Sequence, residues 1–314
     1  MSTDNAFEKL EPYLVKKPKP IIGAETVQII LMREILDYTI LRTEETREIN
    51  TVHTPLSVNA NQPVRRVAFL ATKQKAAESR ELEQLLRTAC KNAELEEPEC
   101  YLKDNLCMQC PRCGLFGGTS TVAGQKDRAN IKHRIEYSTA FSLLPFDDIG
   151  TSHTFNAIND RNQTTGQALG QRFAIQPATL FPSVITLKSV TKDELIMTIK
   201  TLLACKSYGA ESRIGGDIRN TIWCIVAGWE EAITSLELTL ELADKLDSLT
   251  PENIRQTIED KYKSMAGNPS KVSVLDLSEV DALVSACANT EMDKDFLVRA
   301  YKDIADYRTV QLGS

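Results

Sequence analysis

Four cysteines within fourteen consecutive residues constrain the fold of this chain more than any other feature. They are Cys100, Cys107, Cys110 and Cys113, and the Cys-x2-Cys spacing of the last three allows neighbouring sulfurs to share one ion. Zinc takes four thiolate or imidazole ligands in a tetrahedron, and a structural site contributes on the order of 10–16 kcal/mol of apparent binding free energy. That is enough to fold a segment with almost no apolar core. We therefore predict a zinc-binding loop here.

Alternative roles for this cysteine cluster stay open. An iron–sulfur cluster also needs four thiolates. A redox dithiol lacks a thioredoxin-like strand and helix around it, and the polar neighbours Lys103, Asp104, Gln109 and Arg112 disfavour ordinary core thiols. His133 could replace one cysteine as a ligand. The remaining cysteines lie among apolar neighbours and are predicted to be core residues; they are Cys90, Cys205, Cys224 and Cys287.

The amino-acid composition is typical of a soluble globular protein. Of 314 residues, 42% are hydrophobic and 25% are charged, a balance that disfavours wholesale disorder. No run of about 18 apolar residues predicts a transmembrane helix, and residues 1–5 do not resemble a secretory signal. We therefore expect a cytoplasmic chain with no membrane partner and with reduced thiols.

The pattern of apolar residues predicts an α+β sandwich with a four-stranded sheet, interrupted by insertions and followed by helices. Residues 96–133 and the polar stretch Ile149–Phe181 lack periodicity and form the insertions. Thr191 and Glu194 form a capping box that starts a helix. Extended segments are predicted at Thr26–Arg42, Val64–Ala71, Arg134–Leu144, Ser183–Val190 and Asn220–Gly228, and helices at Ala76–Cys90, Thr191–Leu203, Ile233–Ala243, Thr250–Tyr262 and Phe296–Ile304.

Motifs of the common enzyme classes are absent from the sequence. The three histidines, His53, His133 and His153, form no HExxH motif and no adjacent His-Asp pair. Neither a phosphate-binding GxxxxGK[ST] loop nor a GxGxxG or GxSxG motif occurs. The sequence therefore favours binding or assembly over catalysis.

The distribution of charge allows a surface that binds a polyanion. The net charge is −6 overall, but residues 230–314 carry 17 acidic and 9 basic residues, whereas residues 161–220 carry 8 basic and 4 acidic ones. Three pairs of basic residues lie at junctions between predicted elements, where helix N-termini or glycines let a phosphate approach. These pairs are Lys73 and Lys75 before the first predicted helix, Arg213 and Arg219 around Gly215 and Gly216, and Arg161 and Arg172 in the polar insertion.

Six segments of the sequence together resemble a known family, the backbone subunit of the type I-D CRISPR Cascade surveillance complex. The resemblance extends from about residue 20 to residue 250, and its segments occur in the same order. They are CMQCPRCGLFGG (107–118), YSTAF (137–141), HTFN (153–156), QTTGQALG (163–170), TLFPS (179–183) and KSYGAESRIGGDIRN (206–220).

This resemblance implies a palm of the RNA-recognition-motif type, which has a ferredoxin-like α+β fold, with a zinc-binding insertion, a thumb insertion and C-terminal helices. The turn with Lys206, Arg213, Gly215 and Gly216 is then expected beside the RNA, and His153, Phe155 and Asn156 in the thumb, where Phe155 could wedge against a base. The implied boundaries are palm 20–95, 134–148 and 183–230, zinc-binding insertion 96–133, thumb 149–182 and helical region 231–314.

The resemblance also implies the function. Copies of the subunit polymerise along CRISPR RNA, hold its phosphates and leave its bases free to pair with target DNA in antiviral defence, beside other Cascade subunits. Such a subunit is not an enzyme. The alternative is a metal-dependent endoribonuclease that cuts target RNA with a thumb aspartate, for which Asp160 is the candidate. A third possibility is a zinc-stabilised binding protein unrelated to RNA.

Overall fold

A five-stranded antiparallel sheet forms the centre of the molecule in the computed structural model, with the strand order β12-β11-β1-β10-β6. The structure describes residues 7–43, 48–101, 105–119, 130–159, 161–211 and 215–313. In chain order the elements are η2 (Glu11–Tyr13), β1 (Thr26–Ile35), β2 (Thr51–Pro55), β3 (Pro63–Phe69), α1 (Ala71–Asn92), α2 (Pro111–Phe116), β4 (Gly118–Thr119), β5 (Asn130–Ile131), β6 (Ile135–Tyr137), β7 (Ala140–Phe141), α3 (Phe146–Ile149), β8 (Gly150–Ile158), β9 (Thr165–Ile175), β10 (Leu180–Lys188), α4 (Lys192–Ala204), β11 (Ile218–Gly228), α5 (Ser235–Ala243), η3 (Leu246–Ser248), α6 (Pro251–Thr257), η4 (Ile258–Tyr262), α7 (Lys263–Met265), η5 (Pro269–Lys271), β12 (Ser273–Val274), α8 (Leu277–Asn289) and α9 (Lys294–Leu312).

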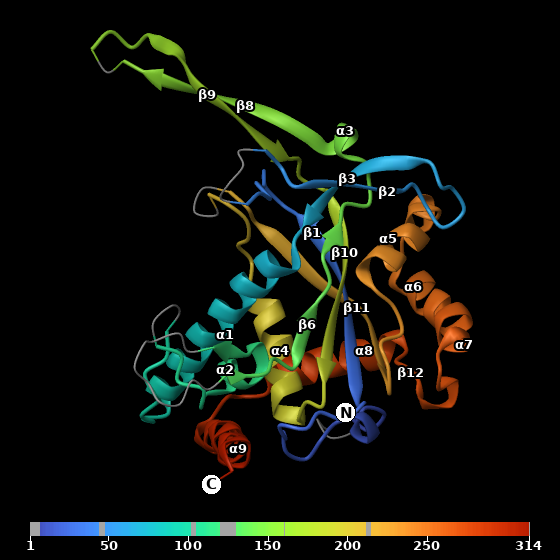
Figure 1. Cartoon of the computed structure of the whole chain (residues 1–314). Helices are drawn as coiled ribbons and strands as arrows, with labels where there is room; N and C mark the ends of the chain where they lie inside the picture. The colour runs from blue at the N-terminus through green and yellow to red at the C-terminus, as the bar shows by residue number, and fades with distance from the viewer. Residues whose placement is uncertain are drawn as a thin grey trace.

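Helices cover both faces of this sheet. Side chains alternate between the two faces along a strand, and in β1 residues 29 and 31 pack into a core with α1 and α4, while residues 30 and 32 pack into a second core with α5 and α6. Figure 1 shows α1 and α4 on one side of the sheet and α5 and α6 on the other. The sheet therefore presents no open face to solvent at its centre.

The predicted strands are present, but they divide between two sheets. The segment Val64–Ala71 becomes β3, which pairs with β2 and β7 in a separate three-stranded sheet. Arg134–Leu144 forms the short strands β6 and β7 rather than one strand, so it joins both sheets. Four of the five predicted segments contribute β1, β6, β10 and β11 to the central sheet, and β12 adds a fifth strand at its edge.

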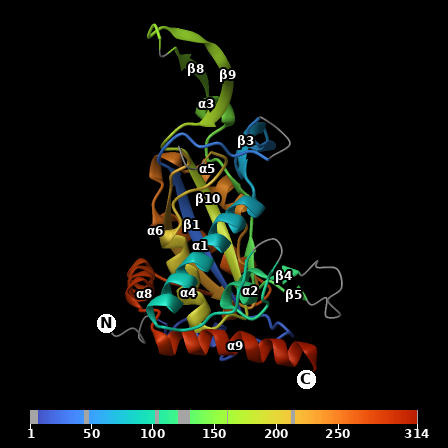
Figure 2. The same ribbon diagram turned by 90° about the vertical axis from the view of Figure 1, so that its left-hand side faces the viewer.

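The polar insertion forms a two-stranded antiparallel hairpin, β8–β9, that projects from the body of the molecule (Figures 1 and 2). We call it the hairpin arm. At its base Gly150 pairs with Ile175, and Ile175 also exchanges backbone hydrogen bonds of 2.8 and 3.2 Å with Thr39. These contacts join the arm to the chain that leaves β1.

Capped helices form most of the C-terminal third. Capping boxes start α4, α5 and α8, and the predicted Thr250 cap, followed by Pro251, starts α6. The prediction placed no separate helix at α8. The helix α9 lies across the end of the molecule opposite the hairpin arm (Figure 2). Within the described residues, no helix has both the length and the apolar character needed to cross a membrane.

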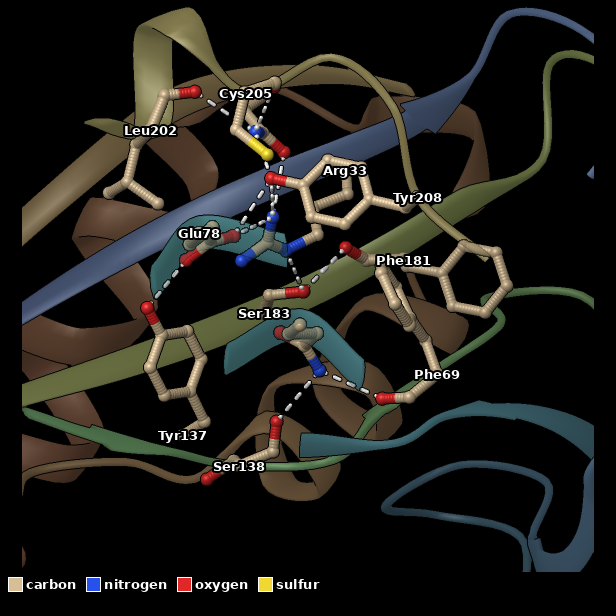
Figure 3. A network of polar contacts seen from close by, with 12 residues as sticks. Arg33, Phe69, Glu78, Tyr137, Ser138, Phe181, Ser183, Leu202, Cys205 and Tyr208 are labelled. Atoms are coloured by element: carbon tan, nitrogen blue, oxygen red, sulfur yellow. Dashed lines mark hydrogen bonds and ion pairs between the residues drawn. The ribbon is translucent and has the colours of Figure 1, made fainter. Parts of the chain in front are cut away.

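A buried ion pair connects the central sheet to α1. Arg33 on β1 and Glu78 on α1 are both fully buried, and Arg33 Nη1 lies 2.7 Å from Glu78 Oε1. Figure 3 shows the hydroxyls that complete the network, in which Tyr208 donates to Glu78 over 2.9 Å and Tyr137 over 2.6 Å. Arg33 also donates to Asn220 over 2.8 Å. One carboxylate and one guanidinium therefore connect five segments of the chain, which are β1, α1, β6, the turn that carries Tyr208, and β11.

Burial makes each charge in this network depend on its partner. Burial is the largest influence on Arg33 and lowers its pKa, but the Glu78 carboxylate together with Tyr208 and Tyr137 outweighs burial, so the pKa lies above its usual value. Burial and the same carboxylate raise the pKa values of Tyr137 and Tyr208 well above the usual value for tyrosine. Both tyrosines therefore remain protonated hydrogen-bond donors.

We predict that Glu78→Gln lowers the free energy of unfolding by about 3–5 kcal/mol, because it leaves the Arg33 charge buried without a counter-charge. Denaturant unfolding followed by circular dichroism measures this loss. The control is Glu252→Gln, which removes an exposed ion pair with Arg255 and should change stability by less than about 1 kcal/mol. Equal effects of the two substitutions would contradict the role assigned to the network.

Candidate metal centre and nucleic-acid interface

The four clustered cysteines converge in space as their spacing predicts. Their sulfur atoms all lie within 4.8 Å of one another. The Cys100 and Cys113 sulfurs are 3.6 Å apart, and those of Cys110 and Cys100 are 3.8 Å apart, distances too long for a disulfide. All four are free thiols, and Cys100, Cys110 and Cys113 are buried. Together they could hold one metal ion.

Local backbone geometry positions these sulfurs. Cys110 is the N-cap of the short helix α2, and its sulfur accepts a hydrogen bond of 3.4 Å from the backbone N–H of Cys113. The N–H of Gln109 donates to Cys107 over 3.4 Å, and the guanidinium of Arg112 donates to Cys113 over 3.8 Å. These donors stabilise negative charge on the thiolates that a metal requires.

The thiols share protons unequally. Hydrogen bonds from Cys107 and Cys110 lower the pKa of Cys100 to about 7, and hydrogen bonds from Cys100, Cys107 and Cys110 lower the pKa of Cys113 far below that of a free thiol. The pKa values of Cys107 and Cys110 are raised, first by their hydrogen bonds to Cys100. Hydrogen bonds within the cluster therefore favour the thiolate form at Cys100 and Cys113 over the thiolate form at Cys107 and Cys110.

The cysteine cluster packs against α9. Ile304 and Tyr307 of this helix share a small core with the four cysteines, and a Cβ on Gly114 would lie 2.3 Å from the Ile304 side chain. His133, the alternative ligand, is not part of the metal-ligating group among the described residues; its Nε2 lies 3.9 Å from Glu136.

The glycine turn lies where β11 begins and bends close to the chain that follows β1. Gly216 has φ +86° and its N–H donates to the carbonyl of Tyr38 over 3.2 Å, while a Cβ on Gly215 would lie 2.7 Å from that oxygen. Only glycine permits this approach. Lys206 is exposed at the start of the turn. Arg213 lies outside the described residues.

Three charged residues meet at the base of the hairpin arm. Arg172 on β9 forms an ion pair with Glu211 of the glycine turn, and Arg42 lies 3.5 Å from the other oxygen of the same carboxylate. On the same side, His153 of β8 is opposite Arg172, and its ring meets Tyr38 edge-on with 4.2 Å between centroids. The structure therefore brings the predicted residues His153 and Arg172 together with the glycine turn.

The remaining basic residues of the predicted site are distributed more widely. The helix α1 begins at Ala71 rather than Ala76 and has no side-chain cap, so Lys73 lies in its first turn and Lys75 at the start of its second turn rather than ahead of the helix. Lys75 is half-buried, and burial followed by the charge of Arg112 lowers its pKa. Arg219 is exposed and paired with Glu34. Arg161 is exposed at the tip of the hairpin arm, away from its base.

Three predicted thumb residues lie wholly or partly outside the described part of the chain. Phe155 and Asn156 belong to β8, but their side chains are not among the described ones, and Asp160 lies outside the described residues. The sequence did not reveal two residues of the candidate interface at the base of the hairpin arm, Tyr38 and Arg42. A tyrosine among polar residues just after a long apolar strand is the only signal that could have indicated them.

Comparisons with known proteins agree with this architecture. The family model described as Csc2 Crispr matches residues 10–302. The crystal structure of Thermofilum pendens Csc2 has a TM-score of 0.68 and 20% sequence identity, covering 97% of this chain and 95% of that chain. Two weaker structural matches were also found. A chain of a type IV-B CRISPR complex has a TM-score of 0.43 and 14% identity, covering 62% of this chain and 90% of that chain, and a chain of a CRISPR RNA-guided surveillance complex before nicking has a TM-score of 0.49 and 11% identity, covering 83% of this chain and 100% of that chain.

A comparison with curated proteins found no match. Because the family model spans most of the sequence, this chain belongs to the Csc2 CRISPR family.

Proposed function

We propose that this chain is a non-catalytic backbone subunit of a type I-D CRISPR surveillance complex that binds CRISPR RNA in many copies, beside other Cascade subunits. The observation that carries the proposal is the convergence of basic side chains at one end of the sheet. Arg172 of the arm and Arg42 of the chain after β1 both contact Glu211 of the glycine turn, and Lys206 is exposed on the same turn. Phosphates of a polynucleotide fit such a surface without reading its sequence.

The order of the sheet supports a palm of the RNA-recognition-motif type. Along the chain β1, α1, β6, β10, α4 and β11 follow a β-α-β-β-α-β order, and their strands lie in the sheet as β11-β1-β10-β6. Ordinary RNA-recognition motifs stack bases on an open sheet face. Here α5 and α6 bury that face, so RNA must use the end of the sheet and the hairpin arm. The palm boundaries at 20–95, 134–148 and 183–230 belong to this proposal.

The hairpin arm is the proposed thumb. It reaches beyond the body of the subunit, so it can contact a neighbouring copy and cross the guide RNA (Figure 1). Head-to-tail contacts of this kind generate an open helical assembly. The acidic helices of residues 231–314 are available to meet a basic surface of the next copy, which reconciles a net charge of −6 with RNA binding. Base pairing with target DNA then supplies specificity.

Zinc is the proposed metal of the cysteine cluster. Sulfurs about 2.3 Å from a tetrahedral zinc ion are separated by about 3.8 Å, which matches the observed separations of 3.6 and 3.8 Å. Four thiolates give a closed, structural site with no position left for a substrate. Zinc would therefore fix the insertion of residues 96–133 against α9.

We predict that purified protein contains one zinc ion per chain and that Cys110→Ser removes it, because three thiolates cannot close the site. Elemental analysis by mass spectrometry measures the metal. Cys287→Ala, at a buried cysteine of the main core, is the control and should retain zinc. Iron in place of zinc, or an unchanged metal content in the Cys110→Ser protein, would contradict the assignment.

We also predict that single-stranded RNA binds with an affinity that falls steeply as salt rises and that is similar for unrelated sequences. The double substitution Arg172→Ala, Lys206→Ala should reduce the slope of log affinity against log salt by about 0.7 for every phosphate that the variant no longer neutralises. Fluorescence anisotropy at several salt concentrations measures this. Lys302→Ala on α9 is the control, since this exposed lysine lies far from the proposed surface. A salt-independent affinity would rule the proposed interface out.

A further inference from the structure

We propose that the base of the hairpin arm is a one-nucleotide site for single-stranded RNA, in which Arg42 and Arg172 take a phosphate, Tyr38 stacks on the attached base, and Glu211 occupies the phosphate position until RNA displaces it. This inference rests on the proposed function. It adds the residues that bind a single nucleotide, and it adds a competing contact from Glu211 that closes the site in the absence of RNA.

Glu211 stands where a phosphate would be expected. One carboxylate oxygen pairs with Arg172 and the other lies 3.5 Å from Arg42, so a single anion bridges two guanidinium groups. Guanidinium groups bind carboxylate and phosphate oxygens alike, and here each of the two arginines meets a different oxygen of one anion. An incoming phosphate can therefore replace the carboxylate without rebuilding the site.

The backbone at Glu211 is also unusual. Its φ is +58°, in the left-handed region that a residue with a side chain seldom adopts. The side chain is partly exposed, at 33% of its surface, and so can swing away into water. A partly exposed carboxylate is easier to displace than a buried one, because water can solvate it once it leaves the two arginines.

Tyr38 supplies the platform for a base. Its backbone is fixed on two sides, because Thr39 pairs with Ile175 of the arm and the N–H of Gly216 donates to the Tyr38 carbonyl. The ring meets His153 edge-on at 74° yet remains 41% exposed. A rigid, exposed aromatic ring beside cations is the arrangement that stacks unpaired bases.

His153 adds a second, independent indication of a ligand. Its Nε2 atom is buried and has no hydrogen-bond partner among the described residues. Buried polar atoms are normally paired, so an unpaired one beside the exposed Tyr38 ring indicates a missing partner. A hydroxyl or base oxygen of a nucleotide bound on Tyr38 can supply it once the Tyr38 or His153 ring turns enough to uncover this atom.

The test measures binding of fluorescein-labelled oligouridylate and of the same ribose-phosphate chain without bases. Glu211→Gln removes the competing charge and should tighten binding of both probes by about threefold or more. Tyr38→Ala should weaken oligouridylate binding by about tenfold and leave the baseless probe unchanged, whereas Tyr38→Phe should behave as wild type.

Matched controls separate the site from general effects. Phe173→Ala removes an equally exposed ring from the opposite side of β9, and Glu252→Gln removes a carboxylate from an exposed ion pair on α6; neither should change the binding of either probe. Circular dichroism confirms that each variant is folded. If wild-type protein binds neither probe, the proposed function fails. If wild type binds but Glu211→Gln does not tighten binding, or Tyr38→Ala affects both probes equally, this inference alone is overturned.

Discussion

The buried ion pair between Arg33 and Glu78 determines how the functional end of this molecule is built. A guanidinium in the core requires a counter-charge, and α1 supplies it through Glu78, so β1 and α1 are fixed relative to each other. Tyr208 then donates to Glu78 and thereby holds the start of the glycine turn against the same helix (Figure 3). The turn carries Glu211 and Gly216, which contact the arm and the chain after β1. The geometry of the proposed RNA site is thus set by a charge pair inside the core.

Closing both faces of the sheet has a functional consequence. An RNA-recognition motif stacks RNA bases on its open sheet face. The proposed backbone subunit instead has to leave the bases of its guide RNA free to pair with a target. Burial of β1 side chains by helices on either side removes that face, so the RNA contacts that we propose use the end of the sheet and the hairpin arm. The contacts expected there are with phosphates and one stacked base.

Much of the fold follows from local sequence signals, and the remainder depends on long-range contacts. The Thr191–Glu194 capping box and the cysteine spacing are local, and the structure contains both the helix and the sulfur cluster. The division of Arg134–Leu144 between two sheets could not be predicted, because its partners are more than forty residues away in the chain. The polar insertion gave no strand signal because its sequence lacks the alternation of apolar and polar side chains that marks a half-buried strand. Tyr38 and Glu211 gained significance only when folding placed them beside His153 and Arg172.

We propose that many copies of this chain coat one guide transcript. Native mass spectrometry of the chain purified with and without co-expressed guide RNA tests it most directly, because it reports protein copies and bound RNA in the same particle. We expect particles that contain several copies of the chain on one RNA, with the number of copies increasing with RNA length. A single RNA-free protomer under both conditions would contradict it.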